Sequence, residues 1–178
     1  MLAPEVPMSH SVAGEPPSAG RRAAPLTTAI YSAAEWDLLT SLPGRVIVAV
    51  AAPAPGRPDR GVAAGLAGLE AVAAGRAFDS DLVRAVVAAI YARDDGNPPP
   101  VERLTDLVDL LAACRAAVRV LHRRADPADS AAYRQWVQSV AARVCRAVPA
   151  PGERSAGQPT SPADRRFLDR LGGALGLV

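Results

Sequence analysis

Residues 101–148 read VERLTDLVDLLAACRAAVRVLHRRADPADSAAYRQWVQSVAARVCRAV. Aliphatic side chains recur here every three or four residues, which is the period of one face of an α-helix. Asp126-Pro127 interrupts the run, because aspartate is a favoured N-cap and proline is favoured in a first turn. The pattern predicts two helices in an antiparallel hairpin with a very short connection. Their predicted apolar faces are Leu104, Leu107, Val108, Leu111, Cys114, Val118 and Leu121, then Tyr133, Trp136, Val137, Val140, Val144 and Val148.

The composition also favours helices over a sheet. Of the 178 residues, 49% are hydrophobic but only 4% are aromatic, and the apolar residues are mostly Ala and Val. Small residues suit close contact between helices, whereas sheets are enriched in aromatic and β-branched residues. We therefore expect an all-α fold, a compact bundle of about six helices. A single domain is predicted at residues 29–178, with a disordered tail at 1–28 and a flexible loop at 149–160.

Two boundaries are predicted near the start of this domain. Ser32 and Glu35 have the spacing of a capping box, so a helix should begin there. Pro43 should end that helix or start the next one, because proline lacks an N–H group. The β-branched run at 46–50 is compatible with a strand or a short buried helix, and we favour the helix because no second stretch offers a strand partner.

Further helices follow from the same rules. A helix after residue 58 should bury Val62, Leu66, Leu69 and Val72, and its glycines, Gly65, Gly68 and Gly75, are explained if a neighbouring backbone packs closely there. Asp79 or Ser80 should cap a helix that contains Leu82 to Ile90. The last helix should start at Ser161-Pro162 and end at Gly176.

The charge and the cysteine content indicate which partners and which cellular compartment to expect. The net charge is +2 and all basic residues are Arg, which does not call for a polyanion, so no nucleic acid is expected. Cys114 and Cys145 would lie too far apart along the hairpin for a disulfide, which favours a reducing compartment. No apolar run has the length of a signal peptide or a membrane span. We expect a cytoplasmic protein with no membrane contact.

Arg115, Arg119 and Arg123 form the candidate partner-binding site, because their spacing places them on one face of a helix. A simpler interpretation is stronger. The first half of the same helix carries acidic residues, so the arrangement complements the helix dipole on an exposed face without any ligand.

No cofactor or metal site is predicted. His10 and His122 have no partner at ligand spacing, and the acidic pairs lie at helix boundaries, where Asp commonly caps. No nucleophile–base arrangement is present, so we expect no enzyme activity. The aromatic residues Trp36, Tyr133 and Trp136 fall on apolar faces and are predicted to pack in the core, although large aromatics can also anchor partners.

With the helices placed, the chain resembles a group of small bacterial helical proteins that is loosely similar to tellurite-resistance TerB-type domains. The residues that carry the resemblance are 32–36, 133–136 and 161–177. The resemblance implies a compact helical bundle with no assigned activity. The chain lacks an acidic cluster like that implicated in metal binding by TerB-type domains, so no functional residue is carried over.

The sequence thus predicts a non-enzymatic helical bundle that acts through protein–protein contacts, with a protein partner or by self-association. The alternative is a TerB-like stress-response protein, or a sensor of small molecules or metals, with a pocket between helices.

Overall fold

The computed structural model describes residues 28–52, 60–94, 106–147 and 161–177, and these residues form helices and no strand. The predicted all-α fold is confirmed. The predicted loop at 149–160, and the predicted tail up to residue 27, lie outside the described residues. The α-helices are α1 (Ala33–Ala51), α2 (Gly61–Ala74), α3 (Asp81–Asp94), α4 (Leu107–Arg124), α5 (Pro127–Arg146) and α6 (Pro162–Ala174), and short 3-10 helices occupy Thr28–Ile30 and Gly75–Ala77.

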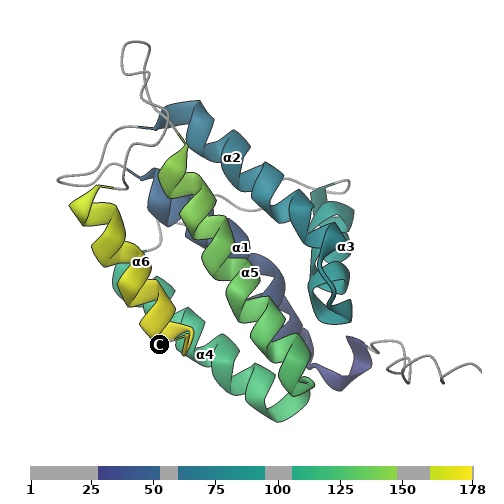
Figure 1. Cartoon of the computed structure of the whole chain (residues 1–178). Helices are drawn as coiled ribbons and strands as arrows, with labels where there is room; N and C mark the ends of the chain where they lie inside the picture. Colours follow the sequence, from purple (N-terminus) through teal and green to yellow (C-terminus); the bar gives the residue numbers. More distant parts are fainter. Residues whose placement is uncertain (1–27, 53–59, 95–105, 148–160, 178) are drawn as a thin grey trace, which may run out of the picture.

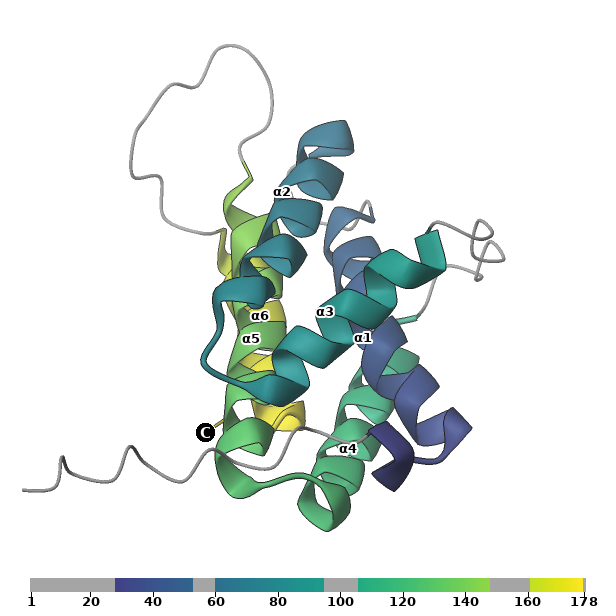
Figure 2. The same ribbon diagram turned by 90° about the vertical axis from the view of Figure 1, so that its right-hand side faces the viewer.

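Helix α5 lies at the centre of the bundle and contacts all five other α-helices (Figures 1 and 2). Helix α1 packs beside it and also contacts α2, α3 and α4. Helix α6 packs against α4 and α5 on one side of this pair, while α2 and α3 lie on the other side (Figure 1). The core therefore follows α5, where Tyr133, Trp136, Val137, Val140 and Val144 are fully buried, as the sequence predicted.

The α4–α5 hairpin has the predicted short connection. Helix α4 ends at Arg124, α5 begins at Pro127, and the Asp126 carboxylate caps α5 by accepting a 2.8 Å hydrogen bond from the Ala128 amide. The predicted apolar face of α4 is right only in part, and its first residue, Leu104, lies outside the described residues. Cys114 and Leu121 are buried, but Val108 is 69% exposed. The buried face also contains alanines, at 113 and 117, because small side chains let neighbouring helices approach closely.

Pro43 does not end a helix, contrary to the sequence prediction, and α1 continues through it. Because proline has no N–H, the carbonyl of Leu39 loses its intrahelical donor. The hydroxyl of Tyr133, on α5, donates a 2.7 Å hydrogen bond to that carbonyl, and both side chains are completely buried. A contact from a distant helix therefore replaces the missing bond. The run at 46–50 belongs to this one long helix, neither a strand nor a separate helix.

Helix α2 faces the opposite way from the prediction. Val62, Leu66 and Leu69 are exposed, and of the four predicted core residues only Val72 is buried. The buried face is made of small residues, because α1 and α5 pack closely against it. A Cβ atom at Gly68 would lie 2.7 Å from Cγ1 of Ile47, and one at Gly75 would lie 2.7 Å from Nε1 of Trp136. The residues buried on α2 are Ala64, Gly68, Ala71 and Val72, followed by Gly75 at its C-terminal end.

Several other predicted helix ends are confirmed. Ser32 and Glu35 form a reciprocal capping box at the start of α1. The Ser80 and Ser161 hydroxyls accept hydrogen bonds from amides in the first turns of α3 and α6. At the end of α6, Gly176 has a φ of +65°, and the amide of Leu177 donates to the carbonyl of Gly172, so that the helix ends in a Schellman motif.

Removing the Tyr133 hydroxyl tests its role as the replacement donor. Tyr133→Phe keeps the ring but leaves the buried Leu39 carbonyl without a donor, which should cost about 1–3 kcal/mol of unfolding free energy. Pro43→Ala supplies a backbone N–H to the same carbonyl. In urea unfolding, the cost of Tyr133→Phe should fall by at least half in the Pro43→Ala background. Equal costs in the two backgrounds would contradict this explanation of the continuous helix.

Two glycines on α2 test its orientation. A Cβ at Gly68 meets Ile47, whereas a Cβ at Gly65 has nothing within 4 Å. Gly65→Ala should therefore stabilise the protein by up to about 1 kcal/mol through helix propensity, while Gly68→Ala should destabilise it because α1 and α2 must move apart. Thermal unfolding of the two variants measures the difference. If both substitutions raise the midpoint, the close α1–α2 packing is wrong.

Candidate functional site

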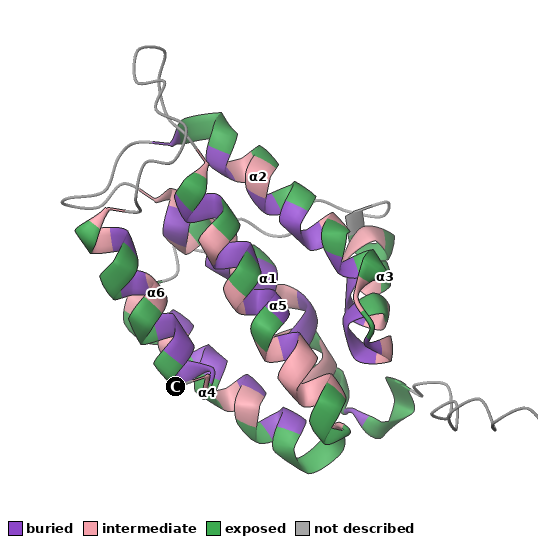
Figure 3. Cartoon of the chain, in the orientation of Figure 1, coloured by how far each residue is buried: buried purple, intermediate pink, exposed green. Residues whose placement is uncertain are grey.

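Three large aliphatic side chains stand exposed on one face of α2. Val62, Leu66 and Leu69 have exposed fractions of 80%, 58% and 55%. Their spacing of four and three residues aligns them along the helix, one turn apart. Figure 3 shows exposed and buried residues alternating along α2 according to the face on which they lie. We call this set of three side chains the α2 outer face.

The chemistry of α2 makes this exposure unusual. Its sequence, GVAAGLAGLEAVAA, contains one charged residue, Glu70. A helix that is apolar all round is normally buried on all sides, in a large core or a membrane. In the described part of the chain no helix has both the length and the apolar character needed to cross a membrane. Three of the four larger aliphatic side chains of α2 thus point to solvent, and only Val72 faces the core.

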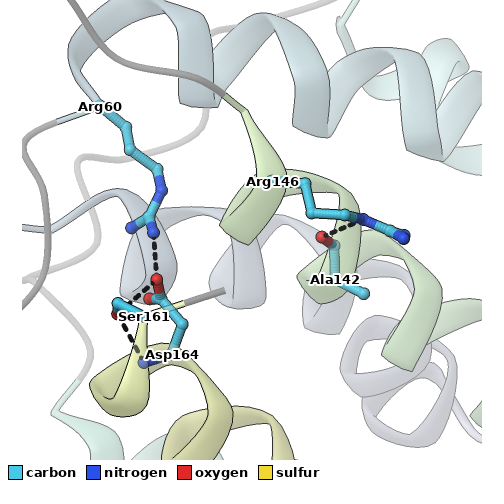
Figure 4. A network of polar contacts seen from close by, with 5 residues as sticks. All are labelled: Arg60, Ala142, Arg146, Ser161 and Asp164. Atoms are coloured by element: carbon cyan, nitrogen blue, oxygen red, sulfur yellow. Dashed lines mark hydrogen bonds and ion pairs between the residues drawn. The ribbon is translucent and has the colours of Figure 1, made fainter. Parts of the chain in front are cut away.

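Buried polar contacts fix the position of α2. Arg60, just before α2, forms a buried ion pair with Asp164 in the first turn of α6 (Figure 4). The Ser161 hydroxyl also donates to this carboxylate, at 2.8 Å. Further along α2, Nε1 of Trp136 donates to the carbonyl of Ala71 at 3.4 Å. Because these groups are buried, the orientation of α2 is set by specific contacts.

The arginine residues predicted as a partner-binding site are all exposed on α4. Arg123 is engaged within the chain, because it donates a 3.2 Å hydrogen bond to the Glu35 carboxylate, and Arg124 lies 3.6 Å from the same group. Arg115 and Arg119 form no ion pair with any other described residue. Of the three predicted arginines, one is thus engaged within the chain. The role of the set in partner binding stays a prediction.

Arg45, on α1, acts on the same buried thiol as Arg115 on α4, which the sequence did not indicate. Burial raises the pKa of the Cys114 thiol to about 11, and the positive charges of Arg45 and Arg115 act in the opposite direction. Both guanidinium groups therefore lie near Cys114, on two different helices. The Nε atom of Arg45 is buried and has no hydrogen-bond partner in the structure. A pattern within one helix cannot reveal a pairing between α1 and α4.

A pocket of about 360 Å³ lies where the α4–α5 turn meets the end of α6. Apolar residues such as Val118 and Leu121 line it together with His122 and Arg134. The Arg134 guanidinium donates to the carbonyls of Leu175 and Gly176, at 3.4 and 3.0 Å. Arg134 therefore secures the end of α6 from within the pocket wall.

Metal-ligating residues do not gather in the part of the chain that the structure describes, where no group of three or more His, Cys, Asp or Glu side chains is found. His122 is exposed on α4, and His10 lies outside the described residues. Cys114 and Cys145 are both buried. Tyr133 and Trp136 are buried in the core and Trp36 packs against it, as predicted.

Comparisons with known proteins return no matching family model, no matching curated protein and no matching solved structure. The resemblance to TerB-type domains therefore stays a prediction.

Glu35 gives the α1–α4 contact a defined pH dependence. Its pKa is lowered from 4.5, first by the hydrogen bond from the Ser32 amide and then by Arg123 and Arg124. A carboxylate with a lowered folded-state pKa stabilises the protein above its unfolded-state pKa, and this stability is lost as the pH falls through the folded-state value. Glu35→Gln should therefore lower the urea midpoint at neutral pH and lose its effect in acid. Arg123→Gln, which keeps the capping box, should have the smaller effect at neutral pH, and the reverse order would contradict this assignment.

Proposed function

We propose that this protein acts through protein–protein contacts and that the α2 outer face is the docking surface. The observation that carries the proposal is the orientation of α2, which exposes Val62, Leu66 and Leu69 and turns a face made mostly of small residues to the core. Single exposed aliphatic residues are common on protein surfaces, but an aligned group marks an interaction site more often.

The spacing of these side chains suits a helical partner. Anchors at positions i, i+4 and i+7 form the ridge that a second helix receives in its own groove. Glu70 is the only charged side chain on α2, so the approach of an apolar helix meets little desolvation cost. This face is therefore better suited to an apolar helix than to a charged polymer.

Two other surfaces support weaker proposals. Arg115 and Arg119, both exposed on α4, suit an acidic partner. The pocket beside Arg134 suits the alternative function, a TerB-like protein that senses a small molecule, but that guanidinium is already engaged with two carbonyls. We place these contacts in the cytoplasm, in keeping with a chain that has only two cysteines.

Photo-crosslinking at single positions tests the main proposal. Benzoylphenylalanine replaces Leu66 on the α2 outer face, and in a separate variant it replaces Ala88, an exposed residue of α3. In the native host, the Leu66 position should form a discrete adduct with a protein, and the Ala88 position should not. A third variant at Arg119 tests the arginine surface in the same cells.

Equal adduct yields at Leu66 and Ala88 would overturn the proposal. A misfolded protein would give a misleading result, so folding is checked separately. Because Leu66 is exposed, Leu66→Glu should change the unfolding free energy by less than about 0.5 kcal/mol. A larger loss would mean that the side chain is packed within the chain.

A further inference from the structure

We infer that α4 and α6 together bind an acidic peptide segment of a partner protein, one that also carries a large apolar side chain. The surface consists of the α4 pair, Arg115 and Arg119, the α6 pair, Arg166 and Arg170, and the pocket beside Arg134. We call it the α4–α6 surface. It is separate from the α2 outer face, because α6 and α2 lie on opposite sides of the central helices α1 and α5 (Figure 1).

Helices α4 and α6 run in the same direction. The short connection between α4 and α5 makes these two helices antiparallel. Arg134, near the start of α5, donates to the carbonyl of Gly176, just after the end of α6. Gln138, one turn later on α5, donates a 3.1 Å hydrogen bond to the carbonyl of Leu168, earlier on α6. Helix α6 is therefore also antiparallel to α5, and so it is parallel to α4.

The two arginine pairs lie at the same level along these helices. His122 of α4 and Gly176 line the same pocket, which fixes the relative level of the two helices. The α4 pair precedes His122 by seven and three residues, and the α6 pair precedes Gly176 by ten and six. At a rise of 1.5 Å per residue, all four arginines lie within about 15 Å of the pocket along the helix axes.

The α6 pair lies on the flank of α6 that faces α4. Each arginine of the pair directly precedes a buried residue, Phe167 or Leu171, and Leu168 and Gly172 directly follow these residues. Successive residues of a helix lie about 100° apart, so the preceding and following residues occupy opposite flanks. The flank with Leu168 and Gly172 faces α5, because Gln138 contacts both. The arginine flank therefore faces α4, the other helix against which α6 packs.

The α4 pair lies on the flank of α4 that faces α6. His122 directly follows the buried residue Leu121 and lines the pocket together with Gly176, so this flank is the one beside α6. Arg115 directly follows the buried residue Cys114 in the same way, and the second arginine of the pair lies one turn later. The two pairs therefore border the same contact between α4 and α6.

The charges of these four arginines are not balanced within the described part of the chain. All four are exposed, and none forms an ion pair with another described residue. Each pair has the spacing i, i+4, at which like charges destabilise a helix. The helix dipole favours basic residues in the last turn, but these are His122, Arg123 and Arg124 on α4, and α6 has none. An acidic partner would supply the missing negative charge.

The pocket at the end of this surface suits an apolar side chain. Its volume is about 360 Å³, and its lining is mostly apolar, with Val118 and Leu121 on the α4 side. Arg134 does not offer its charge to a ligand in the usual way, because Nε and Nη1 already donate to backbone carbonyls. A leucine or phenylalanine side chain therefore fits this pocket better than a carboxylate does.

A peptide fits the α4–α6 surface better than a nucleic acid. Proteins that bind single strands combine basic grooves with aromatic side chains on which bases stack, and none of the described residues that form this surface is Phe, Tyr or Trp. The net charge of +2 is also small for a nucleic-acid-binding chain. Carboxylates one turn apart on a helical peptide match the spacing of the arginines, which bind carboxylates through two parallel hydrogen bonds.

Selection from a random peptide library tests this inference without knowledge of the partner. Displayed peptides of about 15 residues, or four helical turns, are selected on the unmodified chain. Binders should be enriched in Asp and Glu three or four residues apart, beside one large apolar residue. Fluorescence anisotropy with the labelled peptides then measures affinity. Replacing the apolar residue by Ala should raise the dissociation constant at least about tenfold, and added salt should also weaken binding.

Two charge reversals on α6 locate the binding surface. Arg170→Glu should raise the dissociation constant of the selected peptides at least about tenfold. Arg165→Glu is the matched control: it makes the same change of charge on the same helix, at an exposed residue that follows the buried Asp164 and so lies on the flank away from α4. It should change the dissociation constant less than about twofold. Circular dichroism and the thermal midpoint show that both variants are folded.

The remaining outcomes overturn the inference. These are a selection that yields no binders, binders without an acidic bias, or equal losses of affinity with Arg170→Glu and Arg165→Glu. Tighter binding of a single-stranded DNA oligonucleotide than of the selected peptides, lost with Arg170→Glu, would assign the surface to a nucleic acid instead. If the Leu66 position crosslinks to a protein in cells while the library gives no acidic binder, the docking proposal for α2 stands and this inference fails.

Discussion

The hydrogen bond from the Tyr133 hydroxyl to the Leu39 carbonyl is the interaction on which the arrangement of the bundle depends. Pro43 removes the helical donor for that carbonyl, so α1 can continue through the core only where another buried donor reaches it. That donor comes from α5, the helix that contacts every other α-helix. A single bond thus fixes the two central helices against each other at one position along their lengths, and the remaining helices pack around this pair.

The orientation of α2 follows from this central pair. Trp136 lies one turn beyond Tyr133 on α5 and occupies the space where a Cβ on Gly75 would be, and Ile47 on α1 does the same at Gly68. Only small residues can face α1 and α5 at these positions. The larger side chains of α2 are left on the outside as a consequence of close packing in the core. The exposed surface and the core therefore have the same physical cause.

The sequence predicted those features that depend on neighbouring residues. Caps such as Ser32, Asp126 and Gly176 satisfy amides or carbonyls a few residues away, so a local pattern is enough. Pro43 was misjudged because the compensating donor, Tyr133, is 94 residues from Leu39 in the chain. The face of α2 was misjudged for a related reason. Both of its faces are apolar, and only the shape of α1 and α5 decides which one is buried. Likewise, Arg45 joins Arg115 only through the α1–α4 contact.

The size of the α2 outer face determines what kind of contact it can make. Burying a Val or Leu side chain completely is worth about 1.5–3 kcal/mol, so covering the three partly exposed ones of this face gains about 3–5 kcal/mol. Association of two molecules costs about 4–15 kcal/mol in lost motion. For an interface made from this face alone, the free energy gained by burial is therefore close to the cost of association. Such an interface forms at high protein concentration and dissociates at low concentration.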